Sequence, residues 1–299
     1  MWFKNLHVYR LPSPWPMTAE RLDELLRPQA YAEGGSSDMQ VQGWAPPREG
    51  GALAHGMGPH LLINLRTEKK LLPASVVNQV ARAKAQEIEE QQGYKPGRKQ
   101  MREIKEGVID ALLPRAFGIV RDTRAWIDTQ GGWLAVDSST PTRCDELLQL
   151  LNKSVDRMPL AHLHVATSPA AAMTGWLAGD EAPAGFTIDQ DTELRSTGEN
   201  RATVRYVRQS VEADDVRRHI EAGKQCTRLA MTWADRVSFV LTESLALKRI
   251  VALDVLKENA DALAQNDDER FDADFALMTG ELSKMIADVV AALGGEQQA

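Results

Sequence analysis

The stretch FGIVRDTRAWIDTQGGWLAVDSS, residues 117–139, contains two runs that are rich in branched and aromatic side chains. Gly131 and Gly132 separate the two runs. A pair of glycines between two such runs is a typical signal for the tight turn of a β-hairpin. The stretch therefore predicts two antiparallel strands.

Immediately before this stretch, residues 76–117 have the pattern of two helices. The first helical region begins at Pro73 and keeps apolar side chains at helical spacing up to Gly93, and the second follows Pro96-Gly97 and stops at Pro114. Apolar side chains three or four residues apart lie on one face of a helix. The pattern predicts a helical hairpin that ends in LLPRAF, residues 112–117.

The remaining segments alternate between strand-like and helix-like patterns. The predicted strands are 2–11, part of 60–72, a short run at 160–165, 202–209, 236–242 and 247–253. The predicted helices are 19–26, 142–154, 170–177, 212–230 and a last one that begins near residue 271. Residues 34–51 read as a loop in which Val41 and Trp44 indicate a partial anchor. The fold class is therefore α+β, with mixed helices and antiparallel β-hairpins.

The order of these segments divides the chain into three parts. Residues 1–75 and 118–165 are expected to form an N-terminal α/β part, and residues 76–117 a helical hairpin. Residues 166–299 are expected to form a C-terminal α/β part that ends in an acidic helix.

Length and composition are those of a globular protein. The chain has 299 residues, of which 43% are hydrophobic and 26% charged, so it can bury a sizeable core. It contains no uninterrupted apolar run long enough for a membrane span, and its first residues lack the layout of a signal peptide. Two cysteines, Cys144 and Cys226, are too few for a disulfide framework. We expect a cytosolic protein with two buried free thiols.

Charge is distributed unevenly along the sequence. Residues 254–299 hold eleven acids and three bases, a balance of −8, whereas the whole chain carries −7, so the other 253 residues balance at +1. Opposite charges can be kept on different surfaces of one molecule. The body of the protein is therefore free to carry a basic face.

Two segments are candidates for such a face. Residues 95–105 contain five bases and one acid, and residues 195–228 contain eight bases and five acids. Each can be an ordinary solvated surface, but Lys and Arg side chains also bind phosphate oxygens without reading bases, with an affinity that falls steeply with salt. From these two segments we take Arg98, Lys99, Arg102 and Arg205 as DNA-binding candidates.

The most enzyme-like residues are Asp272, Asp274 and Glu281, which could serve a metal-dependent nuclease. On a helix, residues two apart point about 200° away from each other, so Asp272 and Asp274 cannot share one ion there. Acidic side chains near a helix N-terminus are also favoured by the helix dipole. No hydrolase elbow, phosphate-binding loop or dinucleotide fingerprint is present. A structural role is favoured, no cofactor is implied, and the nuclease stays as the alternative.

Several segments resemble the bacterial recombination-associated RdgC family. They are MWFKNLHVYRL (1–11), GWAPP (43–47), LLPRAF (112–117), WIDT (126–129), HIEAGK (219–224), LAMTW (229–233), RFDADFALMTGEL (270–282) and LGGE (293–296). The resemblance implies a multi-subdomain protomer of a ring-shaped homodimer that encloses duplex DNA without sequence preference. It further implies restraint of a RecA-type recombinase, no catalytic site, and a place on the nucleoid.

The resemblance also suggests roles for single residues. Phe117 matches a family phenylalanine that closes the ring by entering a hydrophobic pocket of the partner subunit. Arg208-Gln209 falls where the family has a lysine followed by glutamine facing the hole, and arginine at this position keeps the charge but changes the geometry toward phosphate. A further hypothesis is an interaction protein whose helical hairpin binds another protein.

Overall fold

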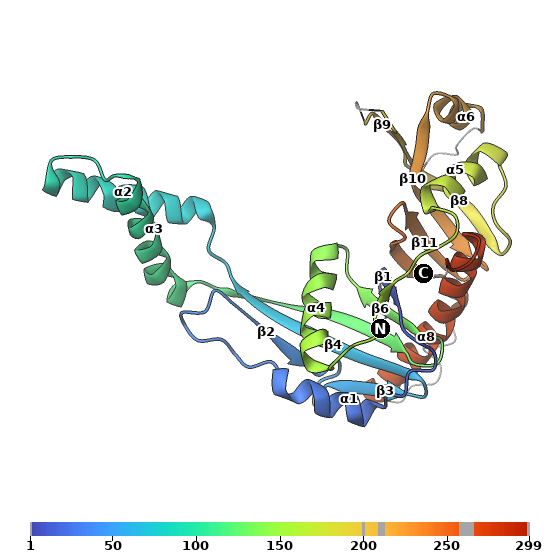
Figure 1. Cartoon of the computed structure of the whole chain (residues 1–299), viewed down its shortest axis with the longest axis horizontal. Helices are drawn as coiled ribbons and strands as arrows, with labels where there is room; N and C mark the ends of the chain where they lie inside the picture. Colours follow the sequence, from blue (N-terminus) through green and yellow to red (C-terminus); the bar gives the residue numbers. More distant parts are fainter. Residues whose placement is uncertain (1, 199–200, 209–212, 257–265, 298–299) are drawn as a thin grey trace.

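The computed structural model describes residues 2–198, 201–208, 213–256 and 266–297. In this part of the chain twelve strands form one antiparallel sheet, accompanied by helices, which confirms the α+β fold class. Figure 1 shows the molecule as an open arc, with helices α2 (Ala74–Gln92) and α3 (Arg98–Leu112) at one end and strand β9 (Thr203–Tyr206) and helix α6 (Ala213–Glu221) at the other.

The sheet runs from one end of the arc to the other. Its order is β2-β4-β5-β6-β1-β12-β11-β10-β8-β9, with β3 beside β4 and β7 beside β1. The first strand of the chain, β1, joins the two halves because it pairs with β6 on one side and with β12 on the other. The other strands are β2 (Gln40–Ala45), β3 (Ala54–Met57), β4 (His60–Lys70), β5 (Gly118–Asp128), β6 (Trp133–Asp137), β7 (Ala161–His162), β8 (Phe186–Ser196), β10 (Lys224–Trp233), β11 (Val237–Thr242) and β12 (Leu247–Ala252), and β1 itself is Asn5–Arg10.

The predicted hairpin at 117–139 is confirmed as β5 and β6, which pair antiparallel with Asp128 opposite Trp133. The Asp128 carboxylate accepts hydrogen bonds from the backbone N–H groups of Gln130 and Gly131, at 3.1 and 2.6 Å. Gly132 has φ +73°, a left-handed conformation that favours glycine. Local chemistry therefore makes this turn.

The helices form two layers, one on each face of the sheet. Besides α2, α3 and α6, the described helices are α1 (Ala19–Leu26), α4 (Pro141–Ser154), α5 (Pro169–Gly179) and α8 (Asp267–Ala292), and the short 3₁₀ helices are η1 (Arg27–Gln29) and η2 (Leu113–Arg115). Helices α1 and α4 pack on the face that carries Ile63 and Ile127, and we call it the α4 face. Helix α8 packs on the opposite face, against Leu62 and Trp126, and we call it the α8 face. Full burial of one such side chain contributes about 1.5–3 kcal/mol.

Several predicted helices are confirmed close to their expected bounds. Thr18 caps α1, because its side chain accepts from the Arg21 N–H, and α2 ends at Gly93 in a left-handed cap. The predicted helical hairpin is formed by α2 and α3, which share a small core of Val77, Ala81 and Val108. The last helix begins at Asp267, earlier than predicted, because Asn266 caps it and three acids fill its first turn.

Other expectations are wrong. The predicted helix 212–230 ends at Glu221, and Lys224–Trp233 is strand β10. Part of the predicted loop 34–51 is strand β2, in which Trp44 is buried as its anchoring role required. Strands β3 and β8 were not predicted. Cys144 and Cys226 are buried free thiols, as expected, although Cys226 lies in a strand and not in a helix.

Among the described residues, no helix is both long and apolar enough to cross a membrane.

Candidate nucleic-acid interface

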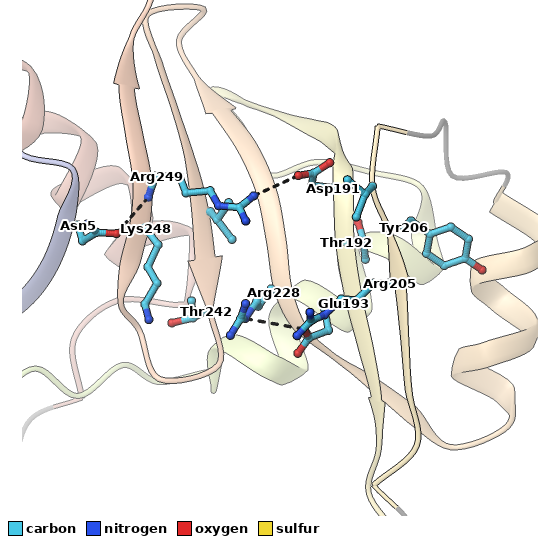
Figure 2. A pocket seen from close by; sticks show the side chains of 12 residues that line it. Asn5, Asp191, Thr192, Glu193, Arg205, Tyr206, Arg228, Thr242, Lys248 and Arg249 are labelled. Atoms are coloured by element: carbon cyan, nitrogen blue, oxygen red, sulfur yellow. Dashed lines mark hydrogen bonds and ion pairs between the residues drawn. The ribbon is translucent and has the colours of Figure 1, made fainter. Parts of the chain in front are cut away.

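Among the described residues, no core cluster formed with a helix covers the α4 face over the C-terminal half of the sheet, beyond helix α4. A shallow cavity of about 230 Å³ lies there, and side chains from six strands line it (Figure 2). Its charged lining residues are Asp191, Glu193, Arg205, Arg228, Lys248 and Arg249. Four bases against two acids give this surface a positive charge in a chain whose net charge is negative.

Strand register creates a row of side chains across this surface. Arg228 of β10 is paired with Thr242 of β11 on one side and with Glu193 of β8 on the other, and Glu193 is paired with Arg205 of β9. Directly paired residues of antiparallel strands project from the same face. Strands β10, β8 and β9 therefore place one acid between two arginines.

A second feature of the surface is a pair of consecutive bases, Lys248 and Arg249. The register between β11 and β12 shifts beside them, and Arg249 has φ +53°. Such a bulge turns the strand so that neighbouring side chains need not alternate between faces, and both bases line the cavity. Lys248 donates to the Ser139 carbonyl at 3.2 Å, and Arg249 Nη1 donates to Asp191 at 3.3 Å.

The acid at the centre of the row is buried. Glu193 is 2% exposed, yet three arginines reach its carboxylate: Arg205 Nε at 2.5 Å, Arg195 Nη2 at 3.0 Å and Arg228 Nε at 4.0 Å. Burial acts to raise the pKa of Glu193, but hydrogen bonds from Thr227 and Arg205 and the charge of Arg228 outweigh it and lower the pKa below its ordinary value. The carboxylate is therefore ionised at neutral pH.

A second groove lies on the same face, on the other side of the start of α4. Lys69, Arg121 and Arg143 are among its lining residues, together with Thr140, which precedes α4. Because Lys248 binds the carbonyl of Ser139, the turn before α4 adjoins both surfaces. We call the following seven residues the cationic track: Lys69, Arg121, Arg143, Lys248, Arg249, Arg228 and Arg205.

The acidic C-terminal helix is on the other face. Helix α8, with Asp267, Asp268 and Glu269 in its first turn, packs on the α8 face of the sheet, opposite the cationic track. The first-turn acids of α8 and the cationic track therefore belong to opposite faces of the sheet.

The structure places the predicted DNA-binding residues in two distant regions. Arg205 belongs to the cationic track, and Arg208 follows β9, where its backbone N–H donates to Asp191 at 2.9 Å. Gln209 lies outside the described residues. Arg98, Lys99 and Arg102 are exposed on α3, at the opposite end of the arc from β9 (Figure 1).

Sequence reasoning did not select most of the track. Arg228 was noted only as part of a basic segment, because β10 was expected to be a helix. Lys69 and Arg121 alternate with side chains of the opposite face along β4 and β5, and that alternation was the only local signal available. Strand pairing brings the residues of the track together, and the register of that pairing cannot be read from any single segment.

Phe117 lies at the base of the helical arm formed by α2 and α3. Its side chain is 83% exposed, and its carbonyl accepts a 2.7 Å hydrogen bond from the Leu71 N–H. Leu71, Ile119 and Val120 are exposed apolar side chains close to it in sequence or through this bond. Phe117 is the most exposed of these apolar side chains.

A family model described as "Putative exonuclease, RdgC" matches residues 1–296 of the chain. The chain belongs to the RdgC family. It is 65% identical over 297 residues to a protein of Herminiimonas arsenicoxydans named recombination-associated protein RdgC, and the match covers 99% of each chain. Proteins of the same name from Bordetella parapertussis and Cupriavidus pinatubonensis are 63% and 59% identical, and each match covers all of both chains.

The word exonuclease in the RdgC description directs attention to the acids that could serve a nuclease. Glu281 is held by Arg236 through two hydrogen bonds of 2.7 and 2.8 Å. Asp272 lies nine residues earlier on α8, about 13.5 Å along the helix axis, and its Oδ1 is 3.1 Å from His55 Nε2. These two carboxylates cannot meet on one ion.

More widely, in the part of this RdgC chain that the structure describes, no three His, Cys, Asp or Glu side chains are placed to hold a metal ion. The candidate site with the clearest geometry is therefore the cationic track.

Proposed function

We propose that the chain binds duplex DNA without sequence preference, encloses it as a ring-shaped homodimer and restrains a RecA-type recombinase, without a catalytic step. The observation that carries this proposal is the cationic track on an open sheet face. The names of the RdgC relatives place those proteins in recombination, and this proposal extends that role to the present chain, in the cytoplasm and on the nucleoid.

The track suits phosphate contact better than base reading. Lysine and arginine contacts to the backbone hold DNA in position but carry no sequence information. Binding of single strands generally uses aromatic side chains on which bases stack. Tyr206 is the aromatic residue at this cavity, but it is paired with Thr192 and points away from the basic side chains (Figure 2). The surface therefore favours a charged backbone as its ligand.

The shape of the protomer supports the ring. Two arcs that face each other can close around a rod (Figure 1), and each arc carries an exposed Phe117 at the base of its arm. In the ring, Phe117 enters a hydrophobic pocket of the partner subunit and closes it. Arg208, at the other end of the arc, faces the hole, and the family resemblance assigns the same role to Gln209. Arg98, Lys99 and Arg102 are additional candidates for phosphate contact from the arm.

The test is the salt dependence of DNA binding, measured by fluorescence anisotropy with two duplexes of equal length and unrelated sequence. Both should bind equally, and the logarithm of the association constant should fall with the logarithm of salt concentration with a slope of about −0.9 per phosphate neutralised. Equal affinity at about 50 mM and about 300 mM salt contradicts the proposal. Addition of the protein to a recombinase strand-exchange reaction should slow the reaction.

The nuclease remains the second candidate because of the family description. Incubation of duplex and single-stranded DNA with Mg²⁺ or Mn²⁺ should leave both intact. Cleavage that disappears in Asp274→Asn would establish the nuclease instead.

A further inference from the structure

The Glu193 carboxylate is an unusual component for a DNA-binding surface, because it repels phosphate. It is buried in β8, and each of its oxygens has a different partner set. Oε1 accepts from Arg195 at 3.0 Å and from the Thr227 hydroxyl at 2.8 Å, whereas Oε2 accepts from Arg205 at 2.5 Å. Arg228 approaches Oε2 to 4.0 Å (Figure 2).

Arg205 and Arg228 keep donors for a ligand. A guanidinium has five N–H donors, and Arg205 uses only its Nε on Glu193. Neither the terminal nitrogens of Arg205 nor the guanidinium of Arg228 donates a hydrogen bond to another described residue. The two side chains are 62% and 47% exposed, so their outer ends are in solvent.

Arg195 differs from these two. It donates to Glu193 with one terminal nitrogen and to Glu243 with the other, at 3.0 and 2.9 Å, so two acids share its charge. Glu243 is 46% exposed and lies outside the buried centre of the cluster. It therefore offers a matched acid on the same surface.

We propose that Glu193 is a positioning residue, whose buried carboxylate holds Arg205 and Arg228 so that their outer N–H groups meet DNA phosphates; this inference rests on the proposed function. A long side chain that is already held in place loses less freedom when it binds. One negative charge fixes two exposed arginines, and the local charge toward the ligand stays positive.

Removal of the Glu193 charge should change DNA affinity in the direction opposite to the one that charge alone predicts. Removal of an acid from a DNA-binding surface raises affinity if the acid only repels phosphate. Glu193→Gln should instead lower affinity, because the uncharged amide has one acceptor oxygen in place of two and cannot accept from Thr227 and Arg195 and also hold Arg205. We expect a loss of about threefold to tenfold, together with a smaller salt slope, by about one, for each phosphate contact that is lost.

The experiment compares the wild type, Glu193→Gln, Glu193→Asp and Glu243→Gln by anisotropy with one fluorescent duplex across a salt series. Glu193→Asp keeps the charge but withdraws it by one methylene, so a loss of affinity in this variant cannot arise from net charge. Glu243→Gln removes an acid that holds only Arg195, and its affinity should equal or exceed that of the wild type. Thermal unfolding of each variant shows which of them are folded.

A folded Glu193→Gln that binds as tightly as the wild type, or more tightly, overturns the inference, as does an equal loss in Glu243→Gln. If Glu193→Gln does not fold, Glu193→Asp decides by the same criterion. If the wild type itself shows no salt-dependent DNA binding, the proposed function fails together with the inference. If only the variants depart from expectation, the inference about Glu193 fails alone.

Discussion

At the scale of single residues, burial and hydrogen bonds together set the direction in which the pKa of a carboxyl group shifts. The Asp137 Oδ1 accepts from the backbone N–H groups of Lys4 and Asn5, at 3.1 and 2.9 Å. Burial, the largest effect, raises the pKa of Asp137 despite these hydrogen bonds. Asp122 shows the reverse, because two 2.8 Å hydrogen bonds from Arg66 lower its pKa.

These two aspartates predict opposite effects of pH on the free energy of unfolding. A raised folded-state pKa gives stability below the unfolded value of 3.8 that is lost as pH rises through the folded pKa. Asp137→Asn keeps an acceptor oxygen without the charge. Its free energy of unfolding should therefore increase relative to that of the wild type as pH rises toward neutral. Asp122→Asn should be less stable than the wild type at neutral pH and should approach it as pH falls below 3.8. Urea unfolding at several pH values measures both, and parallel curves for the two variants would contradict the assignment.

A second prediction at this scale ranks the two basic regions. Arg228 Nε lies 4.0 Å from the buried Glu193 carboxylate, whereas Arg102 is 83% exposed and pairs with Glu106 one helical turn away. A solvated side chain must be ordered when it binds. Arg228→Ala should therefore lower DNA affinity about threefold to tenfold and reduce the salt slope by about one, and Arg102→Ala should have the smaller effect. A larger loss in Arg102→Ala would place the phosphate contacts on the arm.

At the scale of elements, the helical arm has its own small core. Val77, Ala81 and Val108 are its buried residues, and partly buried apolar side chains of α2 and α3 surround them. The main layers, by contrast, bury whole clusters on both faces of the sheet. Stability is therefore expected to differ between the arm and the body.

Val108→Ala tests that difference. Loss of two buried methyl groups should cost the arm about 1–3 kcal/mol, and hydrogen exchange should show faster exchange in α2 and α3 with the central strands unchanged. The matched control is Leu147→Ala on α4, a fully buried residue of the main core, which should accelerate exchange across the sheet as well. Uniform acceleration in Val108→Ala would mean that arm and body unfold together.

Local signals explain which elements could be predicted from the sequence. The β5–β6 turn rests on Gly131-Gly132 and Asp128, and α8 on a long apolar periodicity, so both were foreseen. Residues 224–230 of strand β10 fell within the predicted helix 212–230. The strand lacks a regular alternation of buried and exposed side chains, and its pairing with β8 contains register shifts. The row of Arg228, Glu193 and Arg205 combines three strands. Its charge was visible in the sequence, but its geometry was not.

At the scale of the whole molecule, the most acidic helix and the cationic track lie on opposite faces of the sheet. The acidic helix α8 packs on one face and the cationic track lies on the other. In the proposed function, the cationic track therefore directs attraction to DNA toward its own face of the arc, although the net charge is −7. Closure of two arcs would bring two such faces toward one duplex.

Enclosure predicts that the topology of the DNA controls its release. A closed ring leaves linear DNA by sliding off an end, whereas it leaves a closed circle only when the ring opens. At equal salt, dissociation from circular duplex should be slower than from linear duplex of the same sequence, and bulky groups bound to both ends of the linear DNA should remove the difference. A competitor chase followed by gel electrophoresis measures these rates.

Phe117→Ala connects this behaviour to the proposed closure of the ring. Phe117 is 83% exposed, so its replacement removes little packing within the protomer. The free energy of unfolding should change by less than about 0.5 kcal/mol. If the side chain closes the ring against the partner subunit, the variant should dissociate from circular DNA as fast as from linear DNA while it keeps the salt slope of the wild type. In the proposed function the slope depends on the cationic track, which the substitution leaves intact. Unchanged retention on circles in a folded Phe117→Ala protein would remove Phe117 from the closure, whereas a changed slope would mean that it contributes to the phosphate contacts.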